Sequence, residues 1–226
     1  MNINIYDVSK KAGVSIATVS RVLNGNTRVS EKTRAKVINA MKELDYTPNV
    51  FARGLGLNTM KTIGIMCIDS SDIYLANAVY YLEQELRKYN YDSILCCTGK
   101  DYNNKKNYLE LLLSKRVDGI ILAGSQFVEN TSKHNNDYII NAAKDVPIVL
   151  VNGYLDADNI YSVMCNDEDA VYNATKLLIN NSHRNIVYLY TSTSYSGMNK
   201  YRGYLKAINE AGITLPDEFH HLCGKN

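Results

Sequence analysis

The sequence lacks the features of a membrane or secreted protein. Its 226 residues contain no apolar run long enough to span a bilayer. The first residues, Met1 to Tyr6, lack the basic and then apolar order of a secretory signal. We therefore predict a cytoplasmic protein without a membrane partner. The exported solute-binding protein of a transporter is disfavoured for the same reason.

Motifs of common catalytic and cofactor-binding sites are missing as well. There is no GxGxxG after the first strand-like run, no P-loop, no nucleophile elbow and no HExxH pair. The four histidines are scattered, apart from His220 and His221. We predict that the protein is not an enzyme, with no catalytic residues and no cofactor.

Cysteine is present but without a metal-binding arrangement. The five cysteines are an odd number and lack metal-ligand spacing. Cys96 and Cys97 are neighbours in a strand-like run, so their side chains should point to opposite faces. We predict reduced thiols in a cytosolic protein and no metal site.

Charge is unevenly divided along the chain. Residues 1–61 hold 10 Lys and Arg against 4 Asp and Glu, a net of +6. Residues 62–226 hold 15 against 19, a net of −4. A basic module joined to a larger acidic one suggests that only the first part meets a polyanion, although basic segments also cluster by chance.

The basic segment has the pattern of three short helices. The second is expected over residues 16–23, and the third carries apolar residues at helical spacing. A glycine turn between the first two helices is typical of a helix-turn-helix. The residues suited to cap or end these helices are Asn4, Gly13, Ser15, Asn24, Gly25 and Ser30.

From Thr62 onward, apolar runs typical of buried strands alternate with helical patterns. This alternation predicts parallel strands joined by helices. The strand-like runs are 63–68, 92–97, 117–124, 147–151, 161–165 and 185–190, and the stretch at 218–224 resembles the start of another.

Several of these segments carry a family resemblance. The chain resembles the lactose/galactose repressor (LacI) family over nearly its whole length, most specifically in its first 55 residues. The matching segments are DVSKKAGVSIATVSRVLNG at 7–25, VSEKTRAKV at 29–37, YTPNVFARGL at 46–55, IGI at 63–65, KRVDGIIL at 115–122 and KYRGYLKAI at 200–208.

The resemblance implies a fold and a domain organisation. We expect an all-α helix-turn-helix headpiece followed by an α/β core like that of periplasmic binding proteins. That core would have two Rossmann-like subdomains with parallel sheets, the second one incomplete. The expected divisions are a headpiece at 1–48, a hinge helix and linker at 49–61, and an effector-binding and dimerisation core at 62–226, with subdomains at about 62–155 and 156–226.

The resemblance also implies a base-reading helix. Ile16, Ala17 and Arg21 lie on the outward face of the second helix, and these positions read bases in the family. A guanine can accept two hydrogen bonds from an arginine, and a thymine methyl suits Ile16 or Ala17. The alternative is that Arg21 is a solvated surface arginine.

Further headpiece positions match family residues that touch phosphates. Their hydroxyls, amides and single cation suit that role, although Ser15 and Ser30 also serve as helix caps without any DNA contact. The predicted phosphate-binding residues are Tyr6, Ser15, Thr18, Asn24, Arg28, Ser30, Thr33 and Asn49.

By the same resemblance, residues 50–57 form a hinge helix that orders on DNA and enters the minor groove. Leu55 matches the wedge that unstacks the central base step. Gly54 and Gly56 flank it, and each lowers helix propensity by about 1 kcal/mol relative to alanine. We expect this helix to be hard to form without DNA.

Effector contacts are predicted at three positions, Tyr74, Ser125 and Lys200. Tyr74 offers an aromatic face, and Ser125 follows a strand end, where ligands bind in open α/β sheets. Lys200 occupies a position where relatives commonly carry an arginine, and it keeps the charge without the bidentate fork. Each of the three also fits an ordinary surface residue.

The resulting function is a DNA-binding transcriptional regulator, more specifically a repressor. Its expected partners are double-stranded, pseudo-palindromic operator DNA, a sugar-like effector and a second copy of the chain. The alternative is constitutive DNA binding without a functional effector site. We expect part of the effector-binding machinery to be absent, because no strand or helix crosses back to the first subdomain before the sequence stops at Asn226.

Overall fold

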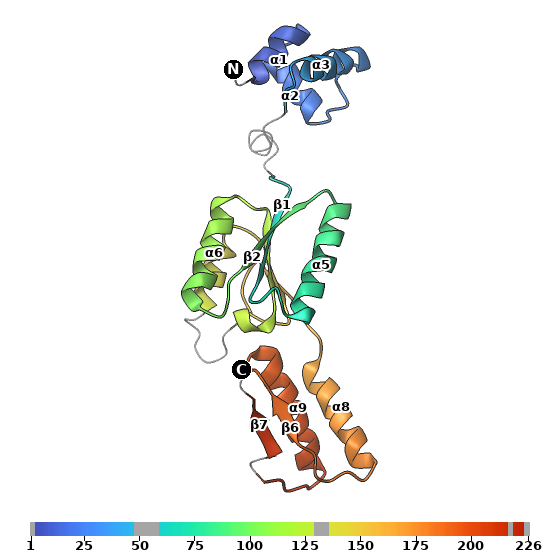
Figure 1. The fold of residues 1–226 in the computed structure, drawn as a ribbon, viewed down its shortest axis with the longest axis vertical. Helices are drawn as coiled ribbons and strands as arrows, with labels where there is room; N and C mark the ends of the chain where they lie inside the picture. Colours follow the sequence, from blue (N-terminus) through green and yellow to red (C-terminus); the bar gives the residue numbers. More distant parts are fainter. Residues whose placement is uncertain (1–2, 48–58, 129–135, 217–218, 224–226) are drawn as a thin grey trace. The chain divides into compact units, whose positions relative to one another are not determined.

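A computed structural model describes residues 3–47, 59–128, 136–216 and 219–223 (Figure 1). The chain forms two compact units, Met1–Lys61 and Thr62–Asn226. No helix within the described ranges is long and apolar enough to cross a membrane.

The first unit contains three helices, α1 (Ile5–Ala12), α2 (Ile16–Leu23) and α3 (Glu31–Glu43). Each begins where the sequence provides a capping side chain. Asn4 forms a capping box with Asp7, and Ser15 and Ser30 each accept a backbone N–H three residues onward. Gly13, which ends α1, has φ 66°, a left-handed conformation that glycine adopts without a steric penalty.

The interior of this headpiece is small and made largely of valine. Val8, Val19 and Val37 have no exposed surface, and each comes from a different helix. The apolar spacing in the sequence therefore predicts the packed faces correctly. Helix α2 ends at the predicted residues: Asn24 is its C-cap with φ −88°, and Gly25 after it is left-handed with φ 67°.

The second unit begins with a five-stranded parallel sheet in the order β2-β1-β3-β4-β5. Helices separate the first four strands, as the sequence predicted, and β5 follows β4 without a helix between them. Their bounds are β1 (Thr62–Cys67), β2 (Asp92–Cys97), β3 (Gly119–Ala123), β4 (Ile148–Val151) and β5 (Ile160–Val163).

Helices cover this sheet on both faces (Figure 1). On one face lie α6 (Tyr102–Ser114) and α7 (Asp137–Ala142), whose side chains share a buried cluster with Met66, Leu122 and Leu150 of the strands. On the opposite face lies α5 (Ile73–Lys88), which has no fully buried residue. The short 3-10 helix η1 (Ser125–Phe127) follows β3. We call this part, from β1 to β5 with its helices, the sheet lobe.

The remaining described residues form what we call the helical lobe. It comprises α8 (Asp167–Asn180), β6 (Tyr188–Tyr190), α9 (Tyr195–Glu210) and β7 (His220–Leu222), with β6 and β7 parallel. Gly203 lets α9 approach α8, since a Cβ there would lie 2.1 Å from the carbonyl oxygen of Glu168.

The sheet lobe is larger than the first subdomain inferred from the sequence. We placed its end near residue 155, but β5 pairs with β4 in parallel register, Ile148 opposite Ile160. The first sheet therefore continues to Val163, and the change of lobe falls between β5 and α8. The predicted hinge helix at 50–57, with Leu55, and the predicted phosphate contact Asn49 lie outside the described residues.

Candidate nucleic-acid interface and ligand cleft

Helix α2 turns one side to the headpiece interior and the other to solvent. Val19 and Val22 are buried, whereas Ile16, Ala17 and Arg21 are exposed. The three residues predicted to read bases are therefore accessible on one short helix, whose caps hold it in place. Their contacts with bases remain a prediction.

Two serine–threonine pairs are built alike at the N-termini of α2 and α3. The hydroxyls of Ser15 and Thr18 lie 2.9 Å apart, and so do those of Ser30 and Thr33. Each pair has two hydroxyl hydrogens, and one of them serves the bond within the pair. The second can be donated to an outside acceptor such as a phosphate oxygen.

The loop between α2 and α3 is held by Asn26. Its side-chain oxygen accepts a hydrogen bond of 2.9 Å from the backbone N–H of Arg28. Its backbone carbonyl oxygen accepts one of 2.8 Å from the guanidinium of Arg34. These bonds present the exposed Arg28 side chain to solvent. Tyr6 is also exposed, while the Asn24 side-chain oxygen is buried without a hydrogen-bond partner among the described residues.

A second candidate site lies at the carboxyl end of the large sheet. A pocket of about 290 Å³ opens there, where ligands bind in open α/β folds. It brings together all three predicted effector residues, Tyr74, Ser125 and Lys200. The full lining is Ile68, Asp72, Tyr74, Leu75, Gly124, Ser125, Gln126, Asn152, Cys165, Asp167, Ser196 and Lys200.

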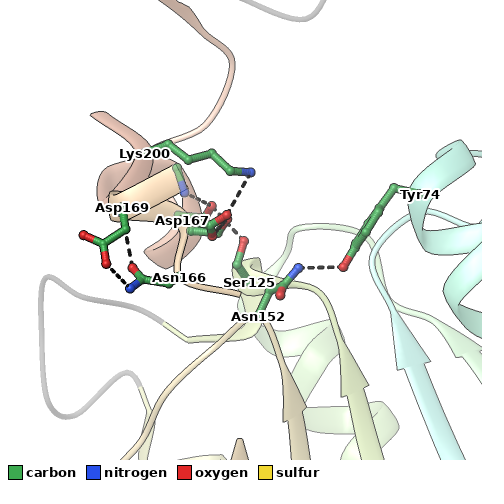
Figure 2. Close-up of polar contacts among 10 residues, drawn as sticks. Tyr74, Ser125, Asn152, Asn166, Asp167, Asp169 and Lys200 are labelled. Atoms are coloured by element: carbon green, nitrogen blue, oxygen red, sulfur yellow. Dashed lines mark hydrogen bonds and ion pairs between the residues drawn. The ribbon is translucent and has the colours of Figure 1, made fainter. Parts of the chain in front are cut away.

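One wall is built from α5 and the end of β4. Asp72 caps α5 by accepting the N–H groups of Tyr74 and Leu75. The Tyr74 hydroxyl accepts a bond of 2.6 Å from the side-chain amide of Asn152 (Figure 2). Asn152 is left-handed, with φ 59°, a conformation that asparagine tolerates better than most residues. This backbone turn directs the amide across the pocket toward Tyr74.

The opposite wall belongs to the helical lobe. Asp167, at the start of α8, accepts a hydrogen bond from the Ser196 hydroxyl and lies 3.6 Å from the Lys200 ammonium (Figure 2). Its side chain is only 15% exposed, so this ion pair is partly shielded from water. The charge of Lys200 is therefore already balanced within the pocket.

Ser125 links the two walls. Its hydroxyl donates to the hydroxyl of Ser194, the residue that caps α9. Polar donors and acceptors thus surround a partly apolar pocket, which suits binding of a small polar molecule. No cluster of three or more side chains of the metal-ligating types occurs in the described parts of the chain.

Several pocket residues did not emerge from the sequence. Asn152 directly follows one strand-like run and Cys165 is the last residue of another, so the strand-end rule offered a signal for both. The sequence offered no such signal for Asp167 and Ser196, because their hydrogen bond depends on the packing of α8 against α9.

Family models match both units of the chain. Residues 4–49 match the model for bacterial regulatory proteins of the lacI family. Residues 60–225 match the model for periplasmic binding proteins and the sugar binding domain of the LacI family. Together the two matches cover the headpiece and the core.

Individual relatives agree with these models. An HTH-type transcriptional regulator of Lachnoclostridium phytofermentans is 60% identical over 99% of this chain and 67% of its own. The HTH-type transcriptional repressor PurR of Mannheimia succiniciproducens is 34% identical over 95% and 63%. This chain thus spans about two thirds of the length of these curated relatives.

A solved structure extends the likeness to three dimensions. The lac repressor dimer bound to operator and the anti-inducer ONPF superposes with a TM-score of 0.80 at 25% identity. The match covers 95% of this chain and 64% of that one.

Proposed function

Because this chain belongs to the LacI family of bacterial regulatory proteins, we propose that it regulates transcription by binding operator DNA under the control of a small molecule. The observation that carries the proposal is the pairing of two sites in one chain. Ile16, Ala17 and Arg21 are exposed on a capped helix, and a polar pocket lies at the carboxyl end of the core sheet. We assign the protein to the cytoplasm and give it no catalytic role.

Our proposal for the DNA step is recognition by the headpiece. An exposed, rigidly capped helix is the element that enters a major groove in helix-turn-helix proteins. Arg21 supplies the bidentate donor for a guanine, and the hydroxyls of Ser15, Thr18, Ser30 and Thr33 contact phosphates. The +6 net charge of residues 1–61 strengthens attraction to the DNA backbone.

We propose a homodimer on a pseudo-palindromic operator. One headpiece reaches few bases, whereas a two-fold symmetric dimer places two headpieces on two inverted half-sites of the DNA. The outer surfaces of α5 and α6 suit this contact, since Tyr80 and Tyr81 of α5 and Tyr108 and Leu111 of α6 expose large hydrophobic side chains. Tyrosine is enriched in protein interfaces.

The proposed effector is a sugar-like molecule. The pocket offers hydroxyls, amides, a carboxylate and the ring of Tyr74, groups that bind polyhydroxylated ligands by hydrogen bonding and stacking. Ligand binding would act on DNA affinity through the two pocket walls, which come from different lobes. Of the two forms of regulation, repression and activation, we favour repression.

Selection of binding sites from random DNA, followed by titration with sugars, tests the proposal. We expect paired, inverted half-sites and a DNA affinity that one class of ligand changes. Lys200→Met should weaken the ligand response while leaving operator affinity without ligand unchanged. Lys144→Met, which alters an exposed lysine of the sheet lobe, is the matched control. Tight operator binding that no ligand alters would favour constitutive DNA binding instead.

A further inference from the structure

Two cysteines face each other where the first two strands end. Cys67 closes β1 and Cys97 closes β2, and the two residues are partners in the parallel register. Partnered residues of neighbouring strands point to the same face of a sheet. Their sulfur atoms lie 3.6 Å apart, and both are free thiols.

The backbone beyond the pair is held in register. The N–H of Thr98 donates to the carbonyl of Cys67 at 2.9 Å, and the N–H of Gly99 donates to that of Ile68 at 3.0 Å. Neighbouring strands lie about 4.8 Å apart, which is within the range of Cα separations that a disulfide bridges. A disulfide needs sulfurs about 2.05 Å apart, so side-chain rotation can close most of the remaining gap.

The two thiols differ in access. Cys97 belongs to the edge strand of the sheet and is exposed, whereas Cys67 has no exposed surface. Burial, together with the neighbouring Cys97 and Asp69, raises the pKa of Cys67 to about 12. A dissolved reagent therefore meets Cys97 first, because Cys67 is both shielded and protonated.

We propose that Cys67 and Cys97 form a redox-active thiol pair that small-molecule disulfides convert to an intramolecular disulfide. The Cys97 thiolate attacks one sulfur of the reagent, breaks its S–S bond and releases one thiolate. Cys67 then loses its proton to the medium and attacks the Cys97 sulfur, releasing the second thiolate. The protein is oxidised by two electrons, and the reagent is reduced to two thiols.

This modification adjoins the ligand cleft without using its machinery. Ile68, the residue after Cys67, lines the pocket, and Asp72 caps α5 four residues later. The remaining cysteines lie elsewhere: Cys96 is buried on the face of α6, and Cys165 and Cys223 follow β5 and β7. Neither Cys67 nor Cys97 lines the pocket, so the pair is distinct from the proposed effector contacts.

The test uses the full chain with Cys165→Ser and Cys223→Ser, which leaves Cys67, Cys96 and Cys97. The reagent is the aromatic disulfide DTNB under native conditions. We expect release of two thionitrobenzoate ions per chain, the second at a rate independent of reagent concentration. No adduct should remain, and dithiothreitol should reverse the reaction. Tryptic peptides 62–87 and 89–100 should be joined.

Two variants identify the partners. Adding Cys67→Ser should limit release to one ion and leave a stable adduct on Cys97, whereas adding Cys96→Ser should change nothing. The proposal is overturned if the protein with all three thiols keeps a stable adduct. A bond through Cys96, or a bond between two chains, would overturn it as well. The first measurement needs no variant of the pair itself, so a folding defect in Cys67→Ser leaves it decisive.

Discussion

The hydroxyl of Ser125 donates to the hydroxyl of Ser194 at 2.9 Å, which joins the sheet lobe to the N-terminus of α9. The Ser194 oxygen also accepts the backbone N–H of Gly197. One side chain therefore caps a helix and receives a bond from the opposite wall of the cleft.

These two roles of Ser194 are separable by mutation. Ser125→Ala should remove only the link between walls, at a cost of about 0.5–1.5 kcal/mol in the free energy of unfolding. Ser194→Ala should cost about 1 kcal/mol more, because the cap is lost too. Hydrogen exchange at the Gly197 amide should rise in Ser194→Ala and stay unchanged in Ser125→Ala. Equal exchange in the two variants would contradict this division.

Arg21 and Arg28 should differ in how they serve DNA binding. Arg21→Ala should cost about 1–3 kcal/mol on the selected operator and relax the choice of one base pair in each half-site. Arg28→Ala, the matched control, should weaken binding to operator and random DNA alike, since a phosphate contact carries no sequence information. Fluorescence anisotropy with both DNAs measures the difference. Equal losses on both DNAs for Arg21→Ala would place Arg21 on the backbone.

Tyr74 offers the ligand both a ring and a hydroxyl that is already bonded to Asn152. If the ring stacks on the effector, Tyr74→Phe should weaken ligand binding by less than about tenfold and Tyr74→Ala by more, where tenfold is about 1.4 kcal/mol. Isothermal titration with the active ligand reports both affinities. A loss in Tyr74→Phe that equals the loss in Tyr74→Ala would show that the hydroxyl dominates.

The close approach of α8 and α9 depends on Gly203. Alanine there would gain about 1 kcal/mol of helix propensity, but its Cβ would meet the backbone of Glu168 and Tyr172. Backbone atoms move little, so overpacking of about 1–3 kcal/mol should win and Gly203→Ala should be destabilised. Asn209→Ala, at an exposed position of α9, should be neutral or stabilising. Chemical unfolding measures the free energy of unfolding of both variants. A Gly203→Ala variant more stable than the parent protein would refute the close contact between α8 and α9.

The same helices are joined by a bond that depends on pH. The Tyr172 hydroxyl donates to Glu210 at 2.6 Å, and this bond, with Lys176 and Lys206 adding to it, lowers the pKa of Glu210. A lowered pKa in the folded state gives stability at neutral pH. That stability is lost as the pH falls below the ordinary value of 4.5 and through the lowered pKa.

Tyr172→Phe should therefore be less stable than the parent protein at neutral pH and should approach it in acid. Unfolding curves recorded from neutral pH down to about pH 3 test this linkage. A difference that stays constant over that range would mean that the hydroxyl acts through packing rather than through the carboxylate.

Local signals in the sequence predicted local structure well. Asn4, Ser15 and Ser30 cap helices as expected, because a cap depends only on residues within one turn. Strand pairing was harder, since the membership of β5 in the first sheet depends on contacts between distant segments. The facing of Cys67 and Cys97 was invisible for the same reason: register between parallel strands is set through the whole crossover.

The candidate cleft divides in the same way. Tyr74, Ser125 and Lys200 were named from strand ends and from family positions, and they line one pocket. Asp167 was missed, although it meets both Ser196 and Lys200. No pattern in the sequence predicts these two contacts of Asp167, because they arise from the packing of α9 on α8.

The headpiece core has a consequence for how such a protein diverges. Its buried cluster is drawn from Val8, Ala12, Val19, Val22, Val37 and Ala40, and it includes none of the exposed residues of α2. Substitutions at Ile16, Ala17 or Arg21 therefore leave the folding free energy nearly unchanged, because surface changes away from caps and cores usually shift it by under about 0.5 kcal/mol. If these residues read bases as we propose, a duplicated copy of the gene can acquire a new operator preference without compensating mutations.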